Sequence, residues 1–179
     1  MKKRLLILTM SILSSFALAG TPYEHVQTGI SLPETLGGLA RGEVTPYEAA
    51  PGEAGVAVPY DDEQVEVTVF IRQIDPKKTT SAAALVEESL EAVKQLEKTG
   101  TYANVKFYQP TAENETAGWS RGAYTAQAQG VILMSFIYAK IQGGYAIKAR
   151  ITTSNPKSES IPKFIGEFQK IVNEAKPKN

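Results

Sequence analysis

Ser120 lies in a motif that suggests covalent catalysis. Residues 118–122 read Gly-Trp-Ser-Arg-Gly and fit the G-x-S-x-G pattern of a serine-hydrolase nucleophile elbow. That motif acts where a strand leads through a sharp turn into a helix, with an acid and a histidine downstream. Here the residues after Ser120 alternate like a strand, no Asp follows Asp75, and the single histidine, His25, lies upstream. The pattern therefore predicts a glycine-flanked strand start, and we expect a protein that is not an enzyme.

Metal and cofactor chemistry has little support in the residue types. The chain has no cysteine and one histidine, so a zinc site would need a cluster of carboxylates. Asp61, Asp62, Glu63 and Glu66 offer the oxygen donors that calcium prefers, but their spacing matches no calcium loop. No P-loop or dinucleotide-binding glycine motif is present. We expect no metal and no cofactor. Glycoside hydrolysis would need two glutamates brought together by the fold, and the sequence leaves this alternative open.

Aromatic residues and one arginine flank a polar loop in the second half of the chain. Trp, Tyr and Arg are over-represented in binding hot spots, and the single Trp belongs to this group. The candidate binding residues are Tyr108, Trp119, Arg121 and Tyr124, with Tyr145 as a neighbour across the predicted sheet. The alternative is ordinary packing, because Trp and Tyr also fill protein cores.

The first nineteen residues have the three parts of a secretory signal peptide. Three basic residues precede an uncharged, mostly apolar run over 5–13, and the small-residue site Ala17-Leu18-Ala19 follows. The run is shorter than the roughly 20 residues that span a bilayer, although an uncleaved anchor is the alternative. No cysteine follows it, which excludes a lipoprotein. We expect cleavage after Ala19, a periplasmic location and no membrane span after cleavage.

Removal of this signal leaves a modestly acidic chain. The precursor has 19 Lys+Arg and 19 Asp+Glu, and residues 1–19 contain three of the bases and none of the acids, so the mature charge is −3. No basic run in the mature chain is longer than Lys77-Lys78. The sequence therefore predicts no binding to nucleic acid. About 160 mature residues suffice for one domain core.

The first half of the mature chain predicts short strands followed by one long strand and a helix. We expect a flexible leader over 20–28 and short strands from Ile30, two of them antiparallel on either side of Pro51-Gly52. Apolar β-branched residues alternate over 65–72 and form one buried face. An amphipathic helix follows over 81–98, with Thr80 or Ser81 as N-cap and Gly100 as its stop.

The second half predicts a meander of strands and a second helix. Strands are expected over 105–108 and near 119–128, 130–141 and 145–153, the last two joined by a hairpin at Gly143-Gly144. The strand over 131–141 is apolar on both faces and should be central and covered on both sides. Ser160 should cap an amphipathic helix whose apolar stripe runs to position 175.

This order predicts a single α+β domain over 29–175, in which an antiparallel sheet of about six or seven strands is packed between two amphipathic helices. A polar tail over 176–179 follows. The order and length of the elements resemble the PsbP/Mog1-type fold over roughly 29–175, and the segment LPETLGGLARGEVTPYEAAPGEAGVAVPY resembles the opening of uncharacterised proteobacterial envelope proteins. The resemblance implies a non-enzymatic adaptor or assembly role.

Two functions are consistent with these features. The first is an exported, non-catalytic interaction or assembly-accessory module that binds a protein or envelope component through a flat aromatic-rich patch. The second is a periplasmic domain that binds a small ligand, or acts as a weak hydrolase, in a pocket between sheet and helix. The shortage of catalytic residue types favours the first.

Overall fold

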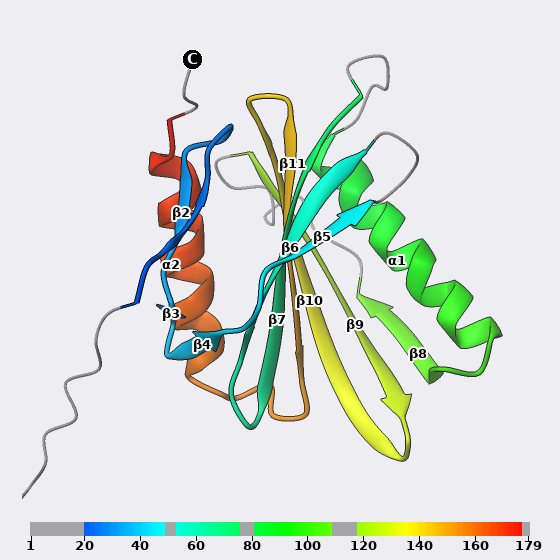
Figure 1. Cartoon of the computed structure of the whole chain (residues 1–179). Coiled ribbons are helices and arrows are strands. Elements are labelled where there is room, and N and C mark those ends of the chain that lie inside the picture. The colour runs from blue at the N-terminus through cyan, green and yellow to red at the C-terminus, as the bar shows by residue number, and fades with distance from the viewer. Residues whose placement is uncertain (1–19, 49–52, 76–80, 109–117, 177–179) are drawn as a thin grey trace, which may run out of the picture.

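The computed structural model describes residues 20–48, 53–75, 81–108 and 118–176 (Figure 1). In these residues the chain forms short strands, a long strand, a helix, four strands and a second helix. The bounds of the elements are β1 Tyr23–His25, β2 Ile30–Leu32, β3 Thr35–Leu36, β4 Leu39–Arg41, β5 Thr45–Glu48, β6 Ala54–Asp61, β7 Val65–Gln73, α1 Ala82–Lys98, β8 Ala103–Tyr108, β9 Trp119–Ala128, β10 Val131–Gln142, β11 Tyr145–Thr153 and α2 Ser160–Glu174.

One large antiparallel sheet organises the domain. Its strand order is β3-β4-β6-β7-β11-β10-β9-β8, with β5 beside β6, while β1 and β2 pair separately. The α+β class and the antiparallel sheet with two helices are therefore confirmed. The predicted six or seven strands are too few, because this sheet has nine strands and the described residues form eleven in all. Turn residues predicted short strands in the first half of the chain, but strands of two to four residues are too short for alternation to define each of them.

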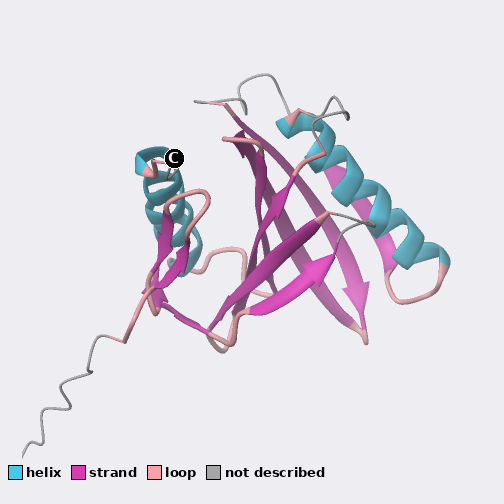
Figure 2. Ribbon diagram, turned by 45° about the horizontal axis from the view of Figure 1, so that its top comes forward, coloured by secondary structure: helices cyan, strands magenta, loops and turns pink. Residues whose placement is uncertain are grey.

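The two helices pack on opposite faces of this sheet and create two hydrophobic cores (Figures 1 and 2). Helix α1 covers β8, β9, β10 and part of β11. Its buried residues Leu85, Val86 and Val93 pack with Tyr124 and Ile137. Helix α2 closes the larger core on the other face. Its buried residues are Ile161, Phe164, Phe168 and Val172.

Strand β7 shows how alternation positions the sheet. Val65, Val67, Val69 and Ile71 are buried on the α2 side, as the sequence predicts. The other face of β7 carries Phe70 and polar residues toward α1. The strand pairs with β6 on one side and β11 on the other, so both of its edges are satisfied.

Strand β10 lies between β11 and β9, which makes it central. The prediction that it is covered on both sides is correct in its middle, where Ile137 faces α1 and Phe136 packs against the α2-side core. It is wrong at the start, where Val131 is 49 % and Ile132 is 70 % exposed. The β9–β10 hairpin extends beyond the ends of both helices (Figure 1).

Turn and cap residues set the ends of the elements. Gly143 and Gly144 have φ values of 60° and 79° and join β10 to β11, as predicted. The Ser81 side chain accepts a hydrogen bond from Ala84 N at 3.1 Å and caps α1. The predicted cap of α2 is displaced by one residue, because Glu159 occupies the N-cap position and the Ser160 hydroxyl donates to Asp62 Oδ2 at 3.2 Å.

The segment over 20–28 differs from the predicted flexible leader, because it forms β1 and the turn into β2. Arg41 donates to the backbone carbonyls of Thr21 and Leu32 at 2.9 and 2.6 Å and fastens the segment to the domain. The predicted signal peptide over 1–19 and nearly all of the polar tail lie outside the described residues. No helix in the described part of the chain is long and apolar enough to span a membrane.

Candidate functional site

The G-x-S-x-G segment does not form a nucleophile elbow. Ser120 is the second residue of β9, and the chain continues from it as a strand to Ala128. It alternates with Trp119 and therefore points to the α1 side of the sheet. His25 lies on the α2 side, where its ring packs edge-on to Tyr145 at 5.3 Å. The strand–turn–helix geometry of that motif is missing.

The carboxylate of Asp62 stabilises the acidic turn between β6 and β7. Asp62 Oδ1 accepts hydrogen bonds from the backbone nitrogens of Gln64 and Val65, both at 2.7 Å, and Oδ2 accepts from Ser160. These bonds lower the pKa of Asp62, the one from Gln64 most. The carboxylate closes the β6–β7 turn and fixes the start of α2 to it. The described residues contain no group of three or more His, Cys, Asp or Glu placed to hold a metal.

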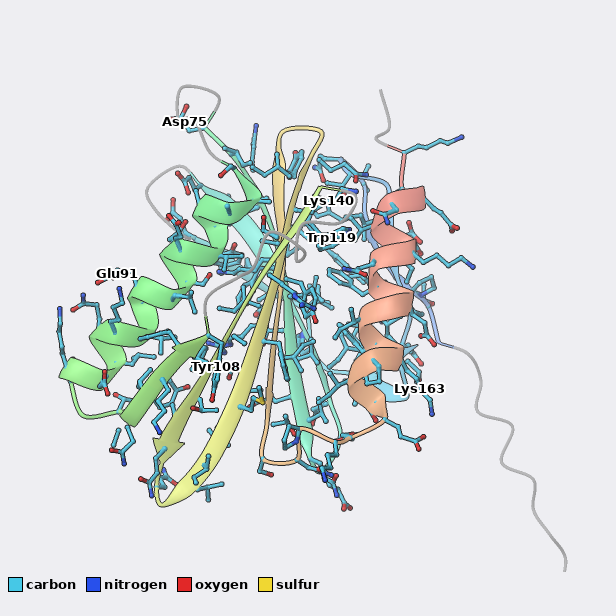
Figure 3. The ribbon with its side chains drawn as sticks, turned by 180° about the vertical axis from the view of Figure 1, so that it is seen from behind. Asp75, Glu91, Tyr108, Trp119, Lys140 and Lys163 are labelled. Carbon is cyan, nitrogen blue, oxygen red and sulfur yellow. The ribbon has the colours of Figure 1, made fainter. Side chains whose placement is uncertain are left out.

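Trp119, one of the predicted binding residues, belongs to the core. It is 3 % exposed and packs edge-on to Phe168 of α2, with ring centroids 5.6 Å apart. Its Nε1 donates to Asn173 Oδ1 at 3.2 Å, and the Lys140 ammonium lies 5.7 Å from the ring. Figure 3 shows Trp119 and Lys140 together beside α2. These contacts agree with the alternative that Trp119 is an ordinary core residue and not part of a binding surface.

The other four predicted residues do not form one surface with it. Tyr124 is 1 % exposed and lies in the core beneath α1, on the opposite face of the sheet from Trp119. Tyr145 is partly buried against the α2-side core. Arg121 is exposed next to Tyr138, whose pKa is raised by burial, with the guanidinium opposing that rise. Tyr108 is 48 % exposed and lies on β8, away from α2 (Figure 3).

Two exposed apolar side chains, Tyr108 and Ile132, lie on the same face of the sheet where β8 runs beside the β9–β10 hairpin. We call these two residues the β8–β10 corner. Among the described residues, the other large apolar side chains that are exposed are Val26 and Val131, and Val131 points to the opposite face of β10 from Ile132. A groove of about 240 Å³ runs along the corner. It is lined by Asn104, Lys106, Tyr108, Thr125, Ala126, Gln127 and Ile132. Ile132 was not among the binding residues predicted from the sequence. The signal that could have identified it is that the strand over 131–141 is apolar on both faces.

The adjoining sheet edge is protected against simple strand addition. The backbone nitrogen of Val105 in β8 donates to Glu97 Oε1 of α1 at 3.0 Å. The pairing of β8 with β9 also shifts register between Ala103 and Lys106. A bulge, a charged side chain and an occupied edge amide are devices that blunt an edge strand. Binding at the corner would therefore use side chains more than the strand backbone.

The predicted pocket between sheet and helix has a counterpart beneath α1. It is a cavity of about 110 Å³ lined by apolar residues and by several polar ones, among them Lys148 and Tyr124. That is smaller than the roughly 300–1,000 Å³ of a drug-sized ligand site. Lys148 was not predicted from the sequence as a site residue. Its signal was the alternation in β11, which puts Ala146, Lys148 and Arg150 on one face and the larger apolar residues on the other.

Comparisons with known proteins place few constraints on the chain. No protein-family model and no curated protein sequence matches it. One similar solved structure is the crystal structure of PA94 from Pseudomonas aeruginosa, a protein of unknown function described as a candidate regulator. It is 14 % identical, the match covers 89 % of this chain and 97 % of that chain, and the TM-score is 0.39. A likeness at this level carries no argument about function.

Proposed function

We propose that the protein is an exported, non-catalytic module that binds a protein or another envelope component at the β8–β10 corner. The observation that supports this is that Tyr108 and Ile132, two of the four exposed large apolar side chains in the described residues, lie on one face and line the same groove. Contiguous exposed apolar surface on a soluble domain marks an interaction site. The groove beside Tyr108 and Ile132 would accept apolar side chains of the partner.

Export by a signal peptide over 1–19 is part of this proposal. The backbone nitrogen of Gly20 donates to Glu34 Oε2 at 3.0 Å. Cleavage after Ala19 would turn this nitrogen into an α-ammonium, and the hydrogen bond would gain an ion pair. N-terminal sequencing of the exported protein should begin at Gly20, and Ala19→Arg should leave the precursor uncut. An exported protein that retains residues 1–19 would contradict cleavage.

A PsbP/Mog1-type arrangement is the finer fold that we propose within the α+β class. Helices on opposite faces of one antiparallel sheet support it, together with the order of elements from β7 to α2. The adaptor or assembly role that this resemblance implies agrees with a binding corner and with Ser120 lying inside a strand. The role is an analogy at the level of the fold.

Crosslinking of the tagged protein in its own envelope, followed by mass spectrometry, tests the binding surface. Wild-type protein should capture one dominant partner reproducibly. The double variant Tyr108→Ser with Ile132→Ser should lose that partner, while Val26→Ser, an exposed apolar residue outside the corner, should keep it. All three should give the same circular dichroism spectrum. Equal capture by the double variant, or no reproducible partner for the wild type, would contradict the proposal.

A further inference from the structure

Both apolar and polar residues line the cavity beneath α1. The apolar residues are Phe70, Ala92, Val93, Leu96 and Ile137. Ser89, Tyr124, Lys148 and Arg150 supply the polar groups. An apolar pocket with a few convergent polar groups is the usual form of a small-molecule site.

One of these polar residues, Lys148, is a partly buried cation that forms no salt bridge within the described residues. Lys148 Nζ donates to Ser89 Oγ at 3.0 Å and lies 5.1 Å from the centre of the Phe70 ring, and no described carboxylate forms a salt bridge with it. Burial lowers the pKa of Lys148, against the effect of Glu88. A lysine ammonium removed from water without a counter-ion is costly to the fold.

The acidic residues nearby are bound to Arg72. Its guanidinium forms ion pairs with Glu53 and with Glu88, the latter at 3.0 Å. Arg72, Lys148 and Arg150 carry three positive charges against the two negative charges of these glutamates. The local excess is therefore positive, and an anion is the ligand that it attracts.

Tyr124 lines the same cavity, is 1 % exposed, and has a buried hydroxyl that makes no well-aligned hydrogen bond within the described residues. The hydroxyls of Ser135 and Tyr102 lie close enough to affect its pKa, and that of Ser135 is already hydrogen-bonded to Thr152 Oγ1 at 2.9 Å. Buried hydroxyls nearly always have a partner, so the Tyr124 hydroxyl has the capacity to bond a ligand or a water in the cavity.

We propose that this cavity binds a short-chain monocarboxylate anion. The carboxylate lies toward Lys148 and Arg150 and accepts a hydrogen bond from the Tyr124 hydroxyl, while the alkyl chain lies against Phe70, Val93 and Ile137. Arg150 is exposed and marks the solvent side of the cavity. Ion pairing compensates the buried ammonium, and the chain contributes the apolar contact that an inorganic anion lacks.

The size of the cavity restricts the length of the chain. Its volume of about 110 Å³ is well below the roughly 300–1,000 Å³ of a drug-sized ligand site, so we expect it to take a small anion. Propionate and butyrate are therefore the probes, and hexanoate is the longer-chain comparison. The cavity lies under α1, so this inference holds whether or not the β8–β10 corner binds a partner.

Isothermal titration calorimetry with sodium propionate, butyrate and hexanoate tests the proposal, with butyramide as the neutral analogue. We expect saturable binding of propionate and butyrate at millimolar concentrations, and at least roughly tenfold weaker binding of butyramide and hexanoate. Amide shifts in nuclear magnetic resonance spectra should map to Ser89, Val93 and Ile137. Binding that shifts residues elsewhere, or butyramide binding as tightly as butyrate, would overturn it.

Three variants assign the binding to this cavity. Lys148→Met should weaken butyrate binding roughly tenfold or more, and Tyr124→Phe should weaken it several-fold, because each removes one polar contact. Lys94→Met is the matched control, since Lys94 is an exposed α1 lysine paired with Glu91. Lys148→Met should also melt at the same or a higher temperature without ligand, so that lost binding cannot come from unfolding. Wild-type affinity in folded Lys148→Met protein would refute the site, as would no saturable binding of either anion to the wild type.

Discussion

Trp119→Ala should destabilise the domain by about 3–5 kcal/mol, because the side chain fills the space between β9 and α2. An aromatic side chain buries about 150–250 Å², and at about 25 cal/mol per Å² the transfer free energy alone has an upper limit of about 4–6 kcal/mol. The hydrogen bond to Asn173 adds little, since Asn173 is exposed and also binds Lys140.

Trp119→Phe is the matched control for this prediction. It retains an aromatic ring against Phe168 and loses the indole nitrogen and part of the volume, so we expect a cost of about 1–2 kcal/mol. Urea unfolding followed by far-ultraviolet circular dichroism measures both variants. Fluorescence is unsuitable for the variants because Trp119 is the single tryptophan. In the wild type, the same residue reports specifically on the α2 side of the sheet.

A loss of less than about 1 kcal/mol in Trp119→Ala would refute the assignment of this residue to the core. If that variant also failed to capture the partner while remaining folded, Trp119 would belong to the binding surface. The expected result is the reverse. Both variants should keep the partner in proportion to the folded fraction, because Trp119 is not part of the β8–β10 corner.

Three further variants probe packing, alkaline stability and the leader. Gly122→Ala should cost about 1–3 kcal/mol because a Cβ there would lie 2.6 Å from a side chain of α1, whereas Gly166→Ala, in open space on α2, should gain up to about 1 kcal/mol in the same urea experiment. Burial raises the pKa of Tyr60 to about 12, against about 10 when unfolded, so its stabilisation is complete below pH 10 and is lost as the pH rises to 12. Tyr60→Phe should therefore reduce the alkaline fall in unfolding free energy by up to about 1.4 kcal/mol per pH unit, and an unchanged slope would refute the shift. Arg41→Met should speed amide hydrogen exchange over 23–32 while leaving β7 protected, because the guanidinium holds two backbone carbonyls of this segment.

Local patterns determined the regular elements correctly where they were long. Alternation over 65–72, the apolar stripe of α1 with its Ser81 cap, and the glycine pair after β10 each report on neighbours within a few residues. The alternation of side chains along a strand could also have shown that the predicted binding residues do not form one surface. Trp119 and Tyr124 are an odd number of residues apart on one strand, so they had to lie on opposite faces.

The sequence by itself determined the class of the domain, the positions of its long elements and the unfavourable context of the G-x-S-x-G motif. Only the tertiary structure decided which face each helix covers, and therefore that Trp119 is core while Ile132 is exposed. It also brought Ser89 to Lys148 across 59 positions of the chain, which created the polar cavity. The physical reason is that periodicity specifies the residues that share a face, whereas the element that covers that face depends on long-range packing.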